Sequence, residues 1–354
     1  MKSLDVIVLG CGVIGASVAR ELNKVGLHVL VVERGEPGRE ASHAAAGMLA
    51  PHGGDVPAEL SELAIASAAM YPEFVRELVD EAAARPQPHL PPIDLRSQGT
   101  ILIGDQQIEG TRTVSGEELA ELEPYLAPSK ARFIQESSVD PRGLMAALVR
   151  SLKHRGIELA HGAAATTIVR AHDGNFEVHT VQSKYSARAI VNCCGAWAGE
   201  IAGVPPLPTR PRKGQMLSLI PHSSTLLRHV IRSEEIYLVP RSDGRIRIGA
   251  TVEDCGFDKK VDPDSIKHMQ HLAEQLVPEI VSAKIDETWA GLRPGTPDDL
   301  PILGESNAPG YFIATGHYRN GVLLAPVTAL IMARLLRGGA AGYTLDAFSP
   351  TRFS

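Results

Sequence analysis

Residues 4–33 read LDVIVLGCGVIGASVARELNKVGLHVLVVE, and this stretch decides the fold of the chain. The apolar runs 4–9 and 28–33 are typical of buried parallel strands, and residues 13–26 between them have the apolar spacing of a helix. A strand, a helix and a second strand within about 30 residues form a βαβ unit. The sequence therefore predicts a nucleotide-binding layout at the start of the chain.

The turn between the first strand and the helix carries the motif GxGxxG, with its glycines at Gly10, Gly12 and Gly15. Glycines at these positions permit a tight turn and a close approach of the backbone, while the helix N-terminus offers unpaired N–H groups to a pyrophosphate. Glu33 ends the second strand, where a carboxylate accepts hydrogen bonds from ribose hydroxyls. This unit fits NAD and FAD equally well.

The composition indicates a mixed α/β chain that is long enough for two ordinary domains. It has 354 residues, 44% of them hydrophobic and only 5% aromatic, and its 33 Gly and 25 Pro predict many turns. A net charge of -6 and the lack of any basic run argue against nucleic acid and anionic membranes as partners. No stretch approaches the roughly 20 apolar residues that span a bilayer.

The cysteines and the N-terminal apolar run bear on where the protein resides. Cys11, Cys193, Cys194 and Cys255 form no CxxC pair and no metal-ligand spacing, so we expect reduced thiols in a cytoplasmic protein. Residues 1–16 also have features of a secretion signal, but their apolar run is short and contains an acidic residue. A buried strand is the better interpretation of that run.

Beyond the βαβ unit, the pattern predicts two interleaved domains. A helix over 59–84 is followed by a Pro-rich break at 86–92, and Asp140 and Pro141 begin a helix over 142–155. Short strands then alternate with a single helix at 264–276, which is typical of an inserted antiparallel sheet. The predicted division gives residues 1–85, 141–204 and 291–354 to a nucleotide-binding domain and residues 86–140 and 205–290 to a substrate domain.

Residues 39–49, which read REASHAAAGML, stand where a third Rossmann strand would normally follow. Small side chains at this density let a backbone pack flat against a large planar ligand. A plain alanine-rich helix has a similar composition, so the stretch alone does not decide between FAD and NAD.

Six segments occur in order along nearly the whole chain. They are the GxGxxG with Glu33, SHAAAGML at 42–49, VNCCGAWA at 191–198, YLVPR at 237–241, WAGLRPGT at 289–296 and GHYRNG at 316–321. In this combination the chain resembles the D-amino-acid oxidase and glycine oxidase superfamily of flavoproteins, and most closely its glycine oxidase branch. The resemblance implies an α/β fold, in which a Rossmann-type FAD-binding domain is joined to an antiparallel-sheet substrate domain.

By position, the resemblance places FAD contacts in the glycine-rich turn, the end of the second strand, the small-residue run and the segment that opens the last helix. These residues are Gly10, Gly12, Val13, Ile14, Gly15, Glu33, Arg34, Ala41, Ser42, Ala46, Gly47, Met48, Val169, His317, Tyr318, Arg319, Asn320, Gly321, Val322 and Leu323. Some superfamily members tether flavin through a cysteine in the segment that corresponds to 291–297. This chain has no cysteine there, so we expect noncovalent FAD.

The resemblance assigns the substrate carboxylate to Arg293, helped by Tyr237 and Arg319. A planar guanidinium binds a carboxylate bidentately, which fixes the position of the α-carbon. Met48 is expected to narrow the cavity above the flavin, which favours glycine, sarcosine or D-alanine over bulky D-amino acids. Residues 233–236, which read SEEI, differ from the pattern of the glycine oxidase branch near the entrance of the pocket.

No residue is predicted to be catalytic. His317 flanks the cofactor segment, but hydride can leave the α-carbon of a neutral amine for flavin without a general base. The helix predicted over 321–336 is expected to point its N-terminal dipole at the flavin pyrimidine edge. Pro326 is expected near the first turn of this helix, where N–H groups lack helical partners.

The resemblance implies oxidative deamination of a small amino acid, glycine first of all, with O2 reoxidising the flavin to give H2O2. Glycine would yield an imine that hydrolyses to glyoxylate and ammonia or, in bacteria, feeds the thiazole half of thiamine synthesis. Close relatives are commonly homotetramers, so a homo-oligomer is expected. Three alternatives stay open: a dehydrogenase that passes electrons to a quinone or carrier, a flavin-binding subunit without turnover, and an NAD-dependent dehydrogenase.

Overall fold

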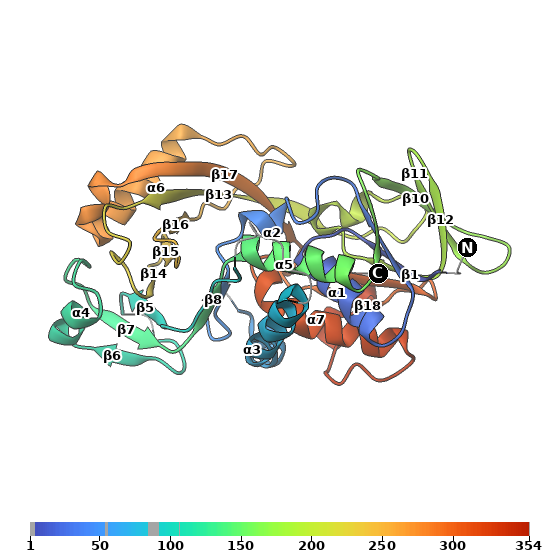
Figure 1. Cartoon of the computed structure of the whole chain (residues 1–354), viewed down its shortest axis with the longest axis horizontal. Helices are drawn as coiled ribbons and strands as arrows, with labels where there is room; N and C mark the ends of the chain where they lie inside the picture. Colours follow the sequence, from blue (N-terminus) through green and yellow to red (C-terminus); the bar gives the residue numbers. More distant parts are fainter. Residues whose placement is uncertain (1–3, 54–55, 84–91, 106, 354) are drawn as a thin grey trace.

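Two large sheets and a small one organise the chain, as the computed structural model in Figure 1 shows. The structure describes residues 4–53, 56–83, 92–105 and 107–353. The helices of this part are α1 (Val13–Lys24), α2 (Ala41–Ala44), α3 (Ser61–Ala83), α4 (Gly116–Leu122), α5 (Pro141–His154), α6 (Pro263–Leu276) and α7 (Gly321–Leu336). Short 3-10 helices are η1 (Ala58–Leu60), η2 (Gly195–Glu200), η3 (Pro278–Ser282), η4 (Asp346–Phe348) and η5 (Pro350–Phe353).

The first large sheet contains the βαβ unit and has the parallel centre of a Rossmann-type fold. Its strands are β1 (Leu4–Leu9), β2 (Val29–Glu33), β9 (Glu158–His161), β10 (Ala165–Arg170), β11 (Phe176–Thr180), β12 (Lys184–Asn192), β18 (Ile302–Glu305) and β19 (Tyr311–Thr315). β1 pairs in parallel with β2 and β12, β2 with β9, and β12 with β19. β1 has the predicted bounds, and β2 begins one residue later than predicted.

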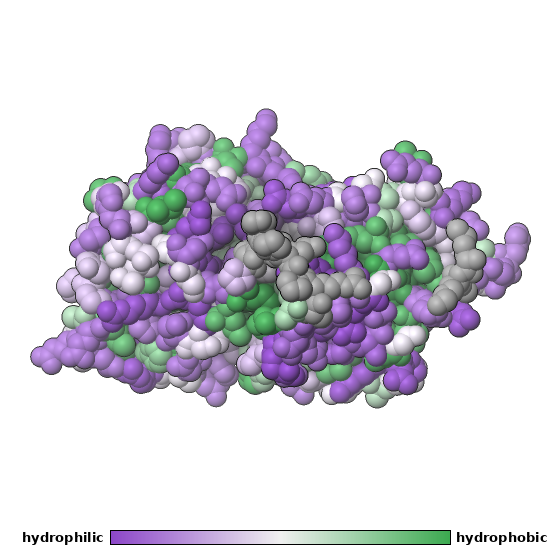
Figure 2. Space-filling view, viewed as in Figure 1, coloured by the Kyte–Doolittle hydropathy of each residue, from purple (hydrophilic) through white to green (hydrophobic). Residues whose placement is uncertain are grey.

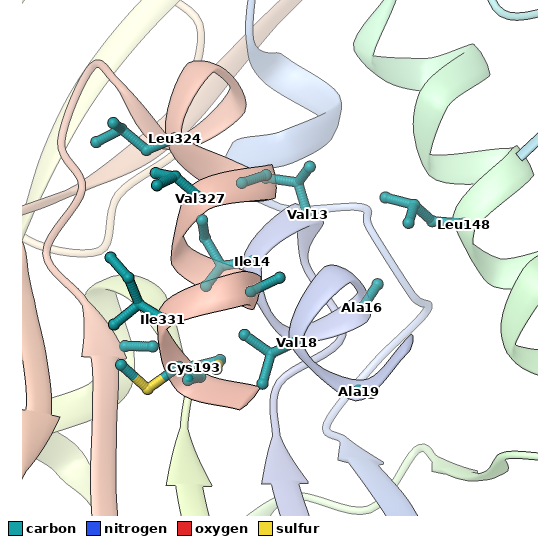
Figure 3. Packing of buried hydrophobic residues seen from close by; sticks show 14 of the residues in the cluster. Val13, Ile14, Ala16, Val18, Ala19, Leu148, Cys193, Leu324, Val327 and Ile331 are labelled. Carbon is teal, nitrogen blue, oxygen red and sulfur yellow. The ribbon is translucent and has the colours of Figure 1, made fainter. Parts of the chain in front are cut away.

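Helices α1, α3, α5 and α7 pack together over one face of this sheet and form the largest hydrophobic core (Figure 3). Val13 and Val18 of α1 lie in this cluster with Val327 and Ile331 of α7 and Leu148 of α5. The helix predicted to open at residues 140 and 141 is α5, whose N-cap side chain accepts hydrogen bonds from two backbone N–H groups of the first turn, as the cap rule requires.

The second large sheet runs in the order β17-β13-β16-β15-β14-β5-β7-β6. Its strands are β5 (Thr100–Ile103), β6 (Arg112–Val114), β7 (Ala131–Ile134), β13 (Arg210–Ile220), β14 (Val230–Arg232), β15 (Tyr237–Pro240), β16 (Ile246–Gly249) and β17 (Lys284–Gly295). It is antiparallel, as predicted, except for the parallel pair β14 and β5. Together with residues of α6, this sheet forms a second hydrophobic core.

A small sheet of β3 (Met48–Leu49), β8 (Ser137–Val139) and β4 (Leu95–Arg96) lies between the two large ones (Figure 1). The small-residue run forms α2 and then β3 instead of a third Rossmann strand. Ala44 and Ala46 from this run share a buried cluster with Met216, Val239 and Trp289 of the second sheet. The run therefore packs against the second large sheet.

The prediction that Pro326 lies near the first turn of α7 is wrong, because it is the sixth residue of the helix. A proline there removes the N–H that would bond the carbonyl oxygen of Val322. The buried hydroxyl of Tyr71 on α3 donates to that oxygen instead. Ser67, one turn earlier on α3, accepts the N–H of Val327 at 3.2 Å. Helix α3 thus replaces the hydrogen bonds that the proline disrupts.

The predicted division into two domains stays a prediction. Its first boundary, between residues 85 and 86, lies in 84–91 and so outside the described residues, and β17 crosses the boundary placed at 290 and 291. Hydrophilic side chains cover most of the face shown in Figure 2, with smaller apolar patches between them. None of the helices in the described ranges is both long and apolar enough to cross a membrane.

Candidate active site

A cavity of about 400 Å³ is lined by elements from both large sheets. This volume is within the usual range of small-molecule sites. Its walls come from the β1–α1 turn, the end of β2, the α2–β3 segment, residues 193–197, the first turn of α7 and one face of the second sheet. Segments that are far apart in the sequence, including parts of all six motifs, therefore meet at one place.

The glycine-rich turn brings backbone rather than side chains to the cavity. Gly10 has φ +89°, and a Cβ on it would stand 2.6 Å from the carbonyl oxygen of Cys193. A Cβ on Gly15 would stand 1.9 Å from the carbonyl oxygen of Gly10, so this glycine sets the close packing of α1 on the turn. The N-cap, Gly12, has no side chain to cap α1, and the N–H of Val13 donates to the hydroxyl of Ser42 at 2.9 Å. Apart from this one bonded N–H, no N-cap side chain covers the start of α1, and a helix N-terminus of this kind suits a pyrophosphate.

Glu33 ends β2 with its carboxylate buried at the cavity wall. One oxygen accepts the N–H of Cys11 at 2.7 Å, and the other accepts the N–H of Gly35 at 2.9 Å. A carboxylate has about four acceptor positions, so two backbone bonds leave capacity for ribose hydroxyls. The neighbouring Arg34 guanidinium stacks on the ring of Trp197, 3.4 Å from its centroid.

The second sheet contributes a row of side chains that project from one face. Arg232 on β14 is opposite Tyr237 on β15, Tyr237 is opposite Gly249 on β16, and Gly249 is opposite Met216 on β13. Residues directly opposite one another in antiparallel strands point to the same face. Gly249 leaves the space that the tyrosine ring fills, because a Cβ there would stand 2.6 Å from the hydroxyl oxygen. The hydroxyl reaches the sulfur of Met216 at 3.8 Å.

Arg293 lies on β17, on a wall of the same cavity. Its Nη1 donates to the carbonyl oxygens of Thr251 at 3.1 Å and Lys213 at 3.4 Å. In the described part of the chain, no carboxylate forms an ion pair with it. Gly214 makes this position possible, since a Cβ on Gly214 would stand 2.2 Å from Nη1. The guanidinium is thus held by two carbonyls while its charge is left for an anion in the cavity.

The segment that opens α7 presents backbone N–H groups to the cavity. Asn320 is the N-cap and makes no side-chain capping bond. The N–H groups of the first turn, at the positive end of the helix dipole, are therefore not capped by this side chain. His317 is buried, and its Nε2 lies 3.1 Å from the hydroxyl of Thr328 within α7. Burial lowers the pKa of His317 to about 3, so the ring is neutral. The absence of a catalytic role for His317 stays a prediction. Arg319 also lines the cavity, with its guanidinium 5.4 Å from the ring centroid of Tyr318.

Most of the residues predicted to contact FAD or substrate meet in this cavity. Those that line it are Gly10, Gly12, Val13, Ile14, Glu33, Arg34, Ala41, Ser42, Ala46, Gly47, Met48, Tyr237, Arg293 and the run from His317 to Leu323. Gly15 supports the turn from behind, and Val169 is 38% exposed on β10 and is not part of the lining. The predicted roles of these residues stay predictions.

Sequence reasoning missed several lining residues, among them Gly214, Met216, Ala250 and Arg232. A glycine inside a strand pattern was an available signal for Gly214, because it marks a close approach of another group. No local signal distinguished Arg232 from an ordinary strand arginine. No group of His, Cys, Asp and Glu in the described residues could hold a metal ion.

Comparison with known proteins agrees with this arrangement. The family model described as FAD dependent oxidoreductase matches residues 5–335. The glycine oxidase of Pseudomonas aeruginosa is 34% identical over 349 residues, which cover 94% of each chain. The crystal structure of glycine oxidase from Geobacillus kaustophilus superposes with a TM-score of 0.92 and 32% identity over 99% of each chain.

A longer relative, the bifunctional protein ThiO/ThiG of Synechocystis, is 34% identical over 367 residues. The match covers 99% of this chain but 54% of that protein, so the chain spans about half the length of this relative. The family match over nearly the whole chain agrees with the glycine-rich β1–α1 turn and with Glu33 at the end of β2. The chain belongs to the FAD dependent oxidoreductase family, and glycine oxidases are among the proteins to which it is similar.

Proposed function

We propose that this protein catalyses the FAD-dependent oxidative deamination of a small amino acid, with glycine as the first candidate. The observation that carries the proposal is that Arg293 and Tyr237 line the same cavity as the glycine-rich β1–α1 turn, which suits a dinucleotide. An anion-binding guanidinium beside a flavin site is what a substrate with an α-carboxylate requires. The similarity to glycine oxidases over nearly full length supports the same assignment.

The residues present fit FAD. The open N-terminus of α1 suits its pyrophosphate, Glu33 suits a ribose, and the small side chains of the α2–β3 segment leave room for a flat ring. When bound, FAD supplies the acceptor for the hydride that leaves the substrate α-carbon. Burial raises the pKa of Cys11 and Cys194 to about 12, so the thiols beside the cavity are neutral and poor nucleophiles. This chemistry supports noncovalent binding.

The chain's own contribution is to bind and orient the substrate. Arg293 would hold the carboxylate bidentately, with Tyr237 and Arg319 adding a hydroxyl donor and a second positive charge. Met48 and Met216 line the cavity and reduce the room for a side chain on the α-carbon. Small amino acids such as glycine, sarcosine and D-alanine are therefore the expected substrates. The positive end of α7 would stabilise negative charge that develops at the cofactor.

Finer features of the proposal follow from the same family pattern. We infer that O2 accepts the electrons and is released as H2O2, that the imine of glycine gives glyoxylate and ammonia or supplies thiazole synthesis, and that the protein works in the cytoplasm as a homo-oligomer. A net charge of -6 is consistent with the absence of nucleic acid among its partners.

An anaerobic absorbance titration of the purified holoenzyme tests the proposal. Glycine, sarcosine, D-alanine and D-proline are added in turn, air is then admitted, and H2O2 is assayed. Bleaching by glycine that air reverses, with H2O2 formed, supports an oxidase. Bleaching that air does not reverse indicates a dehydrogenase with a quinone or carrier, and no bleaching by any amine excludes amino-acid oxidation and leaves a flavin-binding subunit. A colourless protein without flavin would favour an NAD-dependent enzyme.

The variant Arg293→Met separates substrate binding from cofactor binding. It should keep its yellow colour while the glycine concentration needed for half-maximal reduction rises about 100-fold, as expected for the loss of a buried ion pair. The variant Arg76→Met is the matched control, because Arg76 is exposed on α3 and its ion-pair partners among the described residues are acids of the same helix.

A further inference from the structure

Arg232 gives the cavity a positive charge that the carboxylate of glycine does not require. Its side chain is 14% exposed, and it lines the cavity one strand beyond Tyr237 in the cross-strand row. A Cβ on Gly53 would stand 3.1 Å from its Nη2, so the guanidinium lies against the chain just after β3. Arg293 is on β17, which is separated from β14 by the strands β13, β16 and β15 in the sheet order. The two arginines therefore reach the cavity from different parts of one sheet.

The bonding of Arg232 leaves its donors available. Within the described ranges it makes no hydrogen bond, and its ion-pair partner is Glu136 at 3.6 Å, which is beyond hydrogen-bond distance. The Glu136 side chain is 2% exposed, and its Oε1 accepts no hydrogen bond. Burial raises the pKa of Glu136, and the positive charge of Arg232 opposes this rise. A guanidinium has five donors in a rigid fork, and this fork faces an open cavity.

We propose that Arg232 is a specificity-determining residue that recognises a second anionic group on the substrate. Among small amino acids, one with a carboxylate on Arg293 and a second acidic group within reach of Arg232, on the nitrogen substituent or on the α-carbon, would then be bound more tightly than its neutral counterpart. This inference rests on the proposed function for turnover, although binding of a dianion does not depend on it. A charge-assisted fork contact of this kind changes affinity about 10- to 100-fold.

The test compares pairs of substrates that differ only in the second acid. N-carboxymethylglycine is paired with sarcosine, and D-aspartate with D-alanine, so the two pairs distinguish an acid on nitrogen from an acid on the α-carbon. For Arg232→Met, kcat/KM should fall about 10- to 100-fold for the acidic member of at least one pair and stay within about threefold for its neutral partner. Arg76→Met serves as the control for a general loss of positive charge and should leave both ratios unchanged.

Two further measurements keep the test decisive. Glu136→Gln retains the side-chain volume and removes the negative charge that competes for Arg232. The kcat/KM for the acidic substrate of a pair should therefore rise severalfold, while kcat/KM for the neutral substrate should not. Calorimetric titration of the holoenzyme with malonate and acetate measures binding without turnover, and Arg232→Met should remove the preference for malonate.

An equal loss of activity on both members of both pairs, with no preference for malonate in the wild type, would show that Arg232 only pairs with Glu136 and would overturn the inference. If no amine reduces the flavin but malonate binding still depends on Arg232, the oxidase proposal fails and the inference stands.

Discussion

The hydroxyl of Tyr71 should stabilise the start of α7 by about 2 kcal/mol, because Pro326 leaves the Val322 carbonyl without a helical donor. Tyr71 is 1% exposed and Val322 is 7% exposed, so water does not readily replace the lost partner. In Tyr71→Phe the ring and its packing remain, and the cost is that of a buried acceptor left unsatisfied, about 1–3 kcal/mol. We expect this loss in the free energy of unfolding, measured in urea, with an unchanged m value.

Two companion variants make the reasoning refutable. Tyr125→Phe removes a hydroxyl from a tyrosine that is 41% exposed and should change stability by less than about 0.5 kcal/mol. Pro326→Ala returns an N–H to α7, so it should stabilise the Tyr71→Phe protein more than the wild type, by about 1 kcal/mol. Equal costs for the two Tyr→Phe changes, or a purely additive double variant, would show that Tyr71 does not substitute for the missing helical bond.

Three other predictions concern the cavity. Gly214→Ala should displace the Arg293 guanidinium and raise KM for glycine about tenfold at unchanged FAD content; an unaltered KM would mean that the guanidinium has room to shift. Glu33→Ala should weaken FAD binding to the apoprotein about tenfold or more by fluorescence titration, whereas Glu36→Ala, at an exposed position, should not. Burial lowers the pKa of His317 from 6.5 to about 3. Between pH 6.5 and pH 3 the unfolded chain therefore binds a proton at this residue that the folded chain does not bind. The contribution of neutral His317 to stability is complete above pH 6.5 and falls as the pH falls below that value. The stability difference between wild type and His317→Gln in urea should accordingly shrink from pH 7 to pH 5; a constant difference would contradict a neutral buried ring.

Local patterns were sufficient to predict the βαβ unit and most of the helices. The apolar runs around the GxGxxG motif gave β1, α1 and β2 nearly to the residue, since a parallel βαβ unit is defined by neighbours in sequence. The cap at Asp140 gave the start of α5 for the same reason. The motif resemblance added the positions of Arg293 and Tyr237, which the structure brings to one cavity.

Features that depend on distant partners could not be predicted. Whether Pro326 is tolerated depends on hydroxyls of α3 that are about 250 residues earlier in the chain. Arg232 reads as an ordinary strand residue until β14 is paired with β15 and its side chain is placed on the cavity face. Val169 was placed only by the resemblance and lies in none of the six motifs, and the β10–β12 meander offered no local signal for which of its residues faces the cavity.

The position of the cavity between two sheets largely separates its two binding tasks. The groups that would hold the nucleotide come mainly from the first sheet and its helices, whereas Arg293 and Tyr237, which would bind the amino acid, project from the second sheet. A substitution in β13–β17 can therefore alter which compound is oxidised without touching a single group that would hold the cofactor. Single substitutions on the second sheet can therefore change substrate preference step by step, while the residues that would bind FAD stay the same.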